Sequence, residues 1–274
     1  MDEPSLQQTG SGESVPEDLL QPAPAPSKRQ PWNPLEHLQF ALLALTIALF
    51  IITFVVQAFR IPSGSMEDTL LVGDYLLVDK TRFGPPGPWQ PILPYRAIRR
   101  GDIVVFRYPV DLSQHFVKRA IGLPGDHIRL WHGRVYINGH ALVEPYVVFK
   151  EHLHDEFRDD FPRGNWDNEN VSAAWSAQLR TLVHGGELVV PRDHYFVLGD
   201  NRDESLDSRY WGFVPRENIV GRPLLIYLSI AGASDDEDDS VASGLADDKL
   251  FTLRARISHV LGNLRWRRIL RLAP

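Results

Sequence analysis

Two short segments of this chain carry side chains suited to acyl transfer. In Ser63-Gly64-Ser65, the glycine permits a tight turn that can leave a neighbouring hydroxyl uncovered as a nucleophile. Lys118 lies in an apolar, strand-like run, where burial disfavours the ammonium form and lowers the pKa of the side chain. A neutral lysine amine can take the proton of a serine hydroxyl. Taken singly, Ser-Gly-Ser also fits an ordinary loop, and Lys118 also fits a side chain that reaches solvent past its apolar neighbours.

A third segment, residues 199–212, concentrates charged and hydrogen-bonding side chains. Such crowding is costly unless the groups satisfy one another, so the segment predicts either a fixed polar network or an exposed charged turn. The chain has neither the G-x-S-x-G elbow nor the S-x-x-K motif of other serine enzymes. Its ten histidines leave a Ser-His-Asp triad open, although none lies in a suggestive context.

An apolar segment without formal charge, residues 38–59, precedes these motifs. As a helix rising about 1.5 Å per residue it would span roughly 33 Å, enough to cross a hydrocarbon core of about 30 Å. We predict a single transmembrane helix over 35–59, preceded by a proline-rich, disordered tail over 1–34. A buried helix and a removable signal peptide are the alternatives, and the length of the apolar run favours a retained anchor.

The composition excludes several classes of protein. With no cysteine among 274 residues there is no disulfide framework, no thiolate nucleophile and no Cys-ligated metal. The formal net charge of −6 argues against a nucleic-acid partner. The sequence Glu151-His152-Leu153-His154-Asp155-Glu156 holds metal-ligand types, but it does not have the H-E-x-x-H spacing, and we interpret it as a solvated loop.

The remainder of the chain predicts a mostly β fold. Short β-rich runs end at Gly-Asp turns, and Asn138-Gly139 is a strong hairpin signal. No βαβ alternation occurs, so the sheets should be antiparallel. After the β region we expect an acidic linker over 231–249. Residues 250–274 form a basic, amphipathic C-terminal segment that either lies on a membrane surface or packs on the globular domain.

Several motifs occur in order behind the apolar segment and together resemble those of a known family. They are Pro62-Ser63-Gly64-Ser65-Met66, Gly73-Asp74, Arg100-Gly101-Asp102-Ile103-Val104, Lys118-Arg119 with Gly122-Leu123-Pro124-Gly125-Asp126, and residues 199–209. The chain resembles the bacterial type I signal peptidases, which are membrane-bound Ser/Lys endopeptidases, over about residues 38–230. The resemblance implies that Ser65 is the nucleophile and Lys118 the general base. Ser63 would donate its hydroxyl to the oxyanion hole beside the Ser65 N–H, and Ser205 would orient the lysine.

The same resemblance assigns supporting residues and a domain plan. Asp207 and Arg209 would form an ion pair that braces the site, and Asp200 and Asn201 would act structurally. Glu67-Asp68 departs from the family pattern and leaves the substrate contacts there open. The implied architecture is a catalytic core over 60–125 and 190–230 with a second β lobe inserted over 126–189.

The resemblance also implies partners and location. The substrates would be secretory preproteins, cut after a small-x-small site, with no cofactor and with the protein favoured as a monomer in the membrane lipid. The span would be single-pass, with the catalytic domain on the extracytoplasmic side. Two other classes stay open from the residues alone: a membrane-anchored β domain that binds proteins without cleaving them, and a Ser/Lys self-cleaving regulator. Residues 1–34 are too short for the DNA-binding domain that such a regulator carries.

Overall fold

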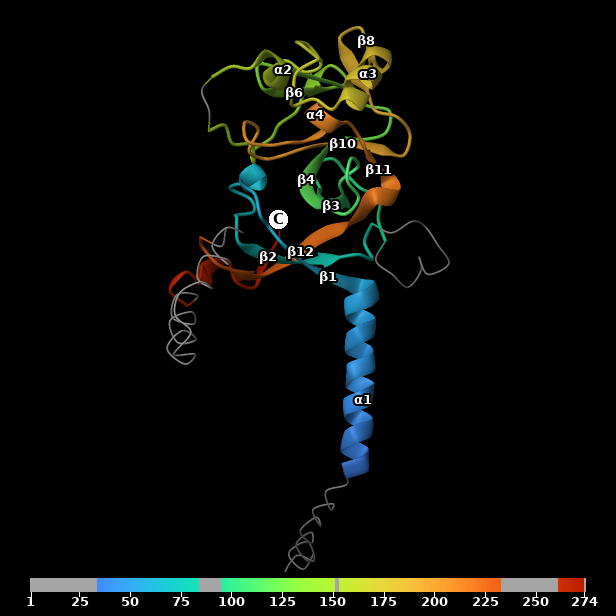
Figure 1. Cartoon of the computed structure of the whole chain (residues 1–274), viewed down its shortest axis with the longest axis vertical. Coiled ribbons are helices and arrows are strands. Elements are labelled where there is room, and N and C mark those ends of the chain that lie inside the picture. The colour runs from blue at the N-terminus through green and yellow to red at the C-terminus, as the bar shows by residue number, and fades with distance from the viewer. Residues whose placement is uncertain (1–33, 84–94, 151–152, 233–260, 274) are drawn as a thin grey trace, which may run out of the picture. The chain divides into compact units, whose positions relative to one another are not determined.

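The computed structural model describes residues 34–83, 95–150, 153–232 and 261–273 (Figure 1). Most of the predicted N-terminal tail and of the predicted acidic linker therefore lies outside the described residues. The chain divides into two compact units, Met1–Thr46 and Ile47–Pro274.

The predicted apolar helix is present but ends earlier than expected. Helix α1, Pro34–Phe50, continues as the π-helical turn η2, Ile51–Val55. These 22 residues have a mean hydropathy of 2.5 in their best window and no buried residue, so by length and composition they could cross a membrane. The predicted span over 35–59 extends four residues too far, because strand β1, Val56–Arg60, begins where η2 ends and pairs with β2.

The larger sheet has eight strands in the order β1-β2-β12-β3-β4-β10-β11, with β13 paired to β12. Its strand pairs are all antiparallel. Besides β1, the strands are β2 Asp74–Asp79, β3 Ile103–Arg107, β4 His115–Gly122, β10 His194–Leu198, β11 Val214–Pro215, β12 Ile219–Ser229 and β13 Arg271–Leu272.

The second sheet has five strands in the order β7-β6-β5-β9-β8, again all antiparallel. These strands are β5 His127–Trp131, β6 Arg134–Ile137, β7 His140–Ala141, β8 Val183–His184 and β9 Glu187–Val189. The short helices around the two sheets are η3 Gly64–Met66, α2 Glu156–Asp159, α3 Ala173–Leu182, α4 Ser208–Trp211, η4 Arg216–Asn218 and η5 Trp266–Arg268. The predicted mostly β, antiparallel fold with an apolar N-terminal helix is confirmed.

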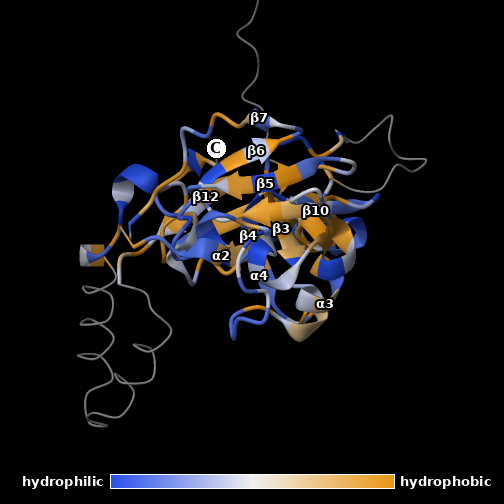
Figure 2. Cartoon of the chain, turned by 90° about the horizontal axis from the view of Figure 1, so that it is seen from above, coloured by the Kyte–Doolittle hydropathy of each residue, from blue (hydrophilic) through white to orange (hydrophobic). Residues whose placement is uncertain are grey.

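The hydrophobic core explains why these strands form. Strand β2 alternates buried and half-buried residues, as a strand with one face in the core should, whereas β3 is buried on both faces over Ile103–Phe106. Strands β3 and β10 are mostly apolar, β5 alternates buried apolar residues with more exposed ones, and the short helices α2 and α4 are mostly polar (Figure 2). Three clusters of buried side chains result, and Val105 of β3 packs in one of them beside Met66 of η3. The turn that carries Ser65 is thus packed against the larger sheet.

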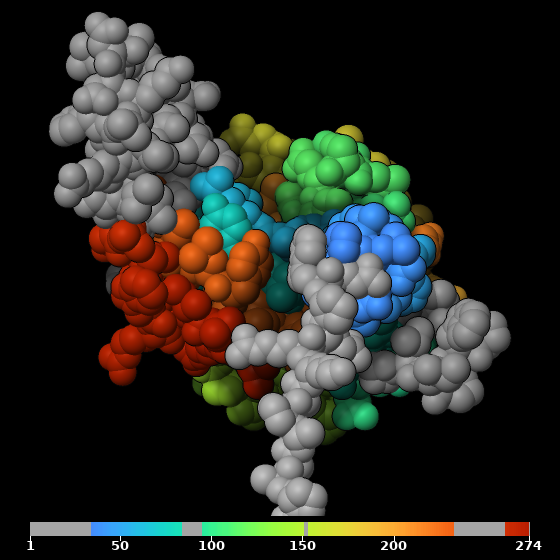
Figure 3. All heavy atoms as spheres, turned by 90° about the horizontal axis from the view of Figure 1, so that it is seen from below, coloured from blue at the N-terminus to red at the C-terminus, as the bar shows by residue number. Residues whose placement is uncertain are grey.

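The C-terminal residues that the structure describes pack on the larger sheet. Strand β13 pairs with β12, and the C-terminal segment lies against the β12 region at the surface (Figure 3). Arg268 donates to both carboxylate oxygens of Asp74, which is fully buried, and to the Thr69 carbonyl. Residues 261–273 therefore pack on the larger sheet, while contact of the basic segment with a membrane surface stays a prediction.

Candidate active site

The turn that carries Ser65 is held by backbone and side-chain bonds. Ser65 lies in the middle of η3 and is buried, with a relative exposure of 6%. The Asn201 N–H donates to the Ser65 carbonyl over 3.2 Å, and the Asn201 side-chain amide donates to the Gly64 carbonyl over 3.3 Å. Asn201, a residue expected to act structurally, thus holds Gly64 and Ser65 by hydrogen bonds to their carbonyl oxygens. Because Ser65 is in the first turn of η3, its N–H has no acceptor within that helix.

Strand β4 brings Lys118 to this turn. Lys118 pairs in register with Val104 of β3, and its side chain is buried, with a relative exposure of 4%. Its Nζ lies 2.5 Å from Ser65 Oγ in a hydrogen bond. These two atoms are 53 residues apart in sequence, and the fold brings them into direct contact. This is the separation that proton transfer from a serine to a general base needs.

Burial also changes the pKa of Lys118. It lowers the pKa of Lys118 from 10.5 to about 8. The carboxylates of Asp207 and Asp200 raise that pKa and Arg209 lowers it, but the cost of burying the ammonium outweighs these charges. A lysine with a pKa near 8 is substantially neutral at mildly alkaline pH, and only the neutral amine can accept a proton.

A cavity of about 300 Å³ opens beside the serine and the lysine. Its walls come mainly from the segment before Ser65 and from β4, and the lining residues are Ile61, Pro62, Ser63, Ser65, Met66, Phe116, Val117, Lys118, Glu204 and Leu206. Ser63 is exposed, and its Oγ lies 3.4 Å from Ser65 Oγ. The predicted oxyanion donor therefore lies next to the predicted nucleophile, at the same cavity.

A buried ion pair connects β4 to the polar segment that follows β10. Arg119 donates Nε to Asp200 Oδ1 over 2.8 Å and Nη2 to Asp200 Oδ2 over 2.5 Å. Thr69 Oγ1 donates to the same Oδ2 over 2.6 Å. Asp200 is fully buried, so these donors satisfy a carboxylate that would otherwise be costly inside the protein. The pair fixes the strand position next to Lys118.

The Asp207–Arg209 pair lies in the same segment. Arg209 donates Nε and Nη2 to the two carboxylate oxygens of Asp207, each over 2.8 Å, and the Gly199 N–H donates to Asp207 Oδ2 over 3.1 Å. Burial raises the pKa of Asp207, but the charge and hydrogen bonds of Arg209 outweigh burial and hold that pKa below its ordinary value. The segment 199–212 is therefore the fixed polar network, not the exposed turn.

The surroundings of Ser205 do not show a hydrogen bond with Lys118 in the described part of the chain. Ser205 is buried, with a relative exposure of 5%, and its hydroxyl is one of the groups that lower the pKa of the neighbouring Asp207. A Cβ added at Gly199 would lie 2.2 Å from Ser205 Oγ and 2.5 Å from the Ser65 carbonyl oxygen. Ser205 and the turn that carries Ser65 are therefore both packed tightly around this glycine. The expectation that Ser205 orients Lys118 stays a prediction.

Several charged partners at the site were not predicted. Lys150 forms an ion pair with Glu67, which lies two residues after Ser65. The Lys150 Nζ also lies 3.8 Å from a carboxylate oxygen of Glu204. Arg202 pairs with Glu144. Arg119 could have been predicted as part of the site, because it follows Lys118 directly in the sequence. No residue near Lys150 or Glu144 in the sequence indicates that either belongs to the site.

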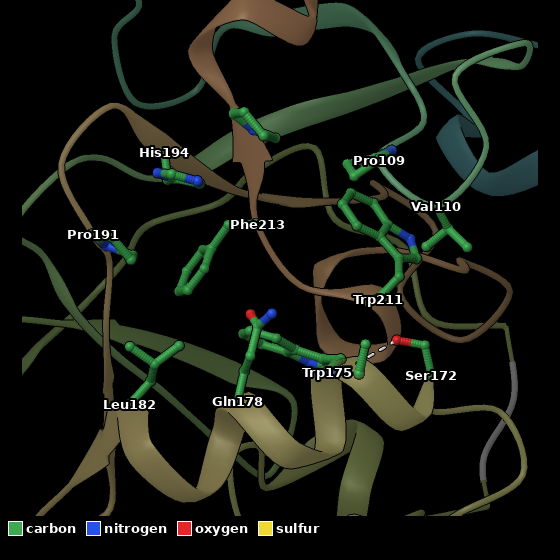
Figure 4. Close-up of a pocket in the computed structure, with 12 residues that line it drawn as sticks. Pro109, Val110, Ser172, Trp175, Gln178, Leu182, Pro191, His194, Trp211 and Phe213 are labelled. Atoms are coloured by element: carbon green, nitrogen blue, oxygen red, sulfur yellow. Dashed lines mark hydrogen bonds between the residues drawn. The ribbon is translucent and has the colours of Figure 1, made fainter.

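A second cavity, of about 400 Å³, contains none of the predicted site residues. It lies between α3 and the β10–β11 region, where Trp175, Trp211 and Phe213 form much of its wall (Figure 4). Its only titratable lining side chain is His194, and no nucleophile and base meet there. The candidate active site is therefore the cavity beside Ser65.

The fold and the site fit one class, the serine endopeptidases, on an antiparallel β domain that follows an apolar N-terminal helix in the sequence. Comparison with known proteins gives the family. The model of the family described as signal peptidase, peptidase S26, matches residues 35–228. The chain therefore belongs to the signal peptidase family, peptidase S26, and the predicted family and activity are confirmed. Its activity is that of a signal peptidase I, a serine endopeptidase that removes signal peptides.

Individual relatives agree. Signal peptidase I of Pseudomonas fluorescens is 37% identical over 207 residues, which cover 68% of this chain and 69% of the relative. The Pseudomonas aeruginosa enzyme is 34% identical over 209 residues, with 68% and 69% covered. Signal peptidase I of Aquifex aeolicus is 34% identical over 218 residues, with 68% and 81% covered. The family is membrane-bound, which is consistent with the apolar helix as an anchor.

Proposed function

We propose that Ser65 and Lys118 are the catalytic dyad of this peptidase. The observation that carries the proposal is the separation of 2.5 Å between Lys118 Nζ and Ser65 Oγ, at a buried position beside a cavity. Neutral Lys118 accepts the hydroxyl proton while Ser65 Oγ attacks the scissile carbonyl carbon. The resulting ammonium gives that proton to the leaving amine nitrogen as the peptide bond breaks. An acyl-enzyme ester on Ser65 is left, and Lys118 then activates the water that hydrolyses it.

The developing oxyanion needs hydrogen-bond donors. We assign this role to the Ser65 N–H and to the Ser63 hydroxyl, which lies 3.4 Å from the nucleophile oxygen. A single donor of this kind contributes about 2.7–4 kcal/mol to transition-state binding, so Ser63→Ala should lower kcat by about 10²–10³-fold. To the buried hydroxyl of Ser205 we assign the orientation of Lys118, as a hydrogen-bond acceptor for the ammonium, which offers three donors.

The substrates that fit this site are secretory preproteins. Signal peptides end in a small-x-small site just after an apolar stretch. The cavity of about 300 Å³ beside Ser65 suits small side chains, and an extended substrate segment can align along it. Ser65 follows the end of the apolar helix at Val55 by ten residues, so the cut would be made close to the membrane surface.

The test is cleavage of a purified preprotein by the full-length protein in detergent, with products located by mass spectrometry. Wild type should cut after a small-x-small site, and Ser65→Ala and Lys118→Ala should each lose at least about 10³-fold in rate. Ser113→Ala, at an exposed serine in the turn before β4, is the matched control and should cleave normally. Undiminished cleavage by either dyad variant would refute the assignment.

We further propose that the catalytic unit lies on the extracytoplasmic side and the N-terminus in the cytoplasm. The chain has no cysteine, so a single introduced thiol reports its own location. Val143 is 87% exposed, and Val143→Cys should react with a membrane-impermeant maleimide on intact spheroplasts. Ser5→Cys should react only after lysis. The reverse pattern would overturn the orientation without touching the dyad.

A further inference from the structure

A cluster of metal-ligating side chains lies outside the active site, in the part of the chain that carries the second sheet. His132 follows β5 at the tight turn to β6, with a positive φ of 49°. His154 precedes α2, and Asp160 follows it. Each of the three offers one ligand atom, and these atoms all lie within 4.8 Å of one another. Segments more than twenty residues apart in sequence thus meet at one point.

The spacing of the cluster suits a small divalent cation. His154 Nε2 and Asp160 Oδ2 are 3.2 Å apart. Two ligands of a tetrahedral zinc ion, each about 2.0–2.1 Å from the metal, lie about 3.3 Å apart. The rings of His132 and His154 have centroids 5.8 Å apart at 49°, so they are not stacked on each other. Both histidines are exposed, so the ligands can close around an ion without disturbing the core.

Asp160 is already fixed in position. It is buried, with a relative exposure of 8%, and its Oδ1 accepts the backbone N–H of His132 over 2.7 Å. That bond fixes the carboxylate on the turn that also carries the histidine ligand. The other oxygen, Oδ2, is the one directed at His154. A carboxylate held by one oxygen with the other directed at an imidazole is a preorganised monodentate ligand.

The second nitrogen of His154 also has a partner. Its Nδ1 lies 3.2 Å from Asp159 Oδ2, and Asp159 is itself held by Arg158 and by the Asp155 N–H. Ligating histidines usually donate their other ring N–H to a carboxylate, which fixes the tautomer and makes the ligand more basic. This arrangement is present around His154 before any ion is bound. A histidinium held between two aspartates would explain the same two contacts, but it would not account for the ligand atom of His132 within 4.8 Å of the other two.

We propose that His132, His154 and Asp160 form a binding site for one divalent transition-metal ion of the zinc type. Two imidazoles and a carboxylate are a donor set that zinc, nickel and copper accept, and water would complete the coordination. The ion would tie the β5–β6 turn to α2. Since Arg158 in α2 accepts a bond from Arg209 at its carbonyl oxygen, over 3.3 Å, the tie would also stiffen the contact between α2 and the catalytic network. The site does not depend on the assignment of the dyad.

Isothermal titration of Zn²⁺ into the chelator-treated full-length protein in detergent tests the proposal. Wild type should bind one Zn²⁺ per chain, and the ion should raise its melting temperature. His132→Ala and His154→Ala should each weaken binding by at least about tenfold. His140→Ala, at an exposed histidine of β7 outside the cluster, is the matched control and should bind as wild type does.

Asp160→Asn protects the test against misfolding, because the amide oxygen can still accept the His132 N–H. It too should lose affinity by at least about tenfold while keeping its circular dichroism spectrum. Absence of saturable one-to-one binding by the wild type would overturn the proposal. So would equal affinities in wild type, Asp160→Asn and the histidine variants.

Discussion

The pH dependence of cleavage follows directly from the burial of Lys118. Its pKa is lowered to about 8, so the neutral base is lost as pH falls through about 8 and gained as pH rises. About one tenth of the lysine is neutral at pH 7 and about nine tenths at pH 9, so kcat/KM should rise about tenfold over that interval and then level off. A lysine at its ordinary pKa of 10.5 would give a rise of about a hundredfold with no plateau.

The assay is kcat/KM for a peptide with a small-x-small site, measured from pH 5.5 to 10 on the full-length protein in detergent. His115→Gln is the control, because His115 is the titratable histidine of the same strand. Its profile should keep the wild-type midpoint. A midpoint near pH 6, or one abolished in His115→Gln, would refute the reasoning that burial of Lys118 sets the profile.

Two further predictions concern the supports of the site. Gly199→Ala would place a Cβ 2.5 Å from the Ser65 carbonyl oxygen, so it should destabilise the fold by about 1–3 kcal/mol and lower the cleavage rate, whereas Gly262→Ala, with nothing within 4 Å, should change neither. Denaturant unfolding and peptide cleavage measure both, and a fully active Gly199→Ala enzyme would contradict the packing. Arg268→Ala leaves the fully buried Asp74 without its ion-pair partner and should cost about 3 kcal/mol in unfolding free energy, whereas exposed Arg267→Ala should cost little. Equal stability of these two arginine variants would show that the C-terminal residues do not brace the sheet.

The candidate site could be placed from the sequence because several short motifs in order resemble one family, whereas each motif alone also fitted an ordinary loop or strand. Ser65 sits in a short turn sequence and Lys118 in an apolar strand, and each signal is contained within a few residues. The charged partners could not be predicted in this way. Arg119 and Asp200 are 81 residues apart, and Lys150 and Glu67 are 83 apart, so any of many acids could have paired with either base. Only the fold selects among them.

The helix boundary failed for a different physical reason. Residues 56–59 carry no formal charge, like the helix before them, and periodicity cannot separate a short strand from a continuing helix over so few residues. Hydrogen bonds to β2, formed by residues some twenty positions later, decide that Val56–Arg60 is a strand. The sequence around His154 favours a solvated loop, because its neighbours do not have a known metal-ligand spacing. The second histidine of the cluster, His132, lies 22 residues earlier and only the fold brings it close.

The measurement that tests the central claim most directly is the chemical capture of the acyl-enzyme. An activated ester of a small-x-small peptide, mixed with the full-length protein and quenched in acid, should leave one acyl group on the tryptic peptide that contains Ser65. The adduct should be absent from Ser65→Ala and strongly reduced in Lys118→Ala, because the base is needed to form it. Product formation with no acyl group on Ser65, or with the group on another residue, would contradict the account.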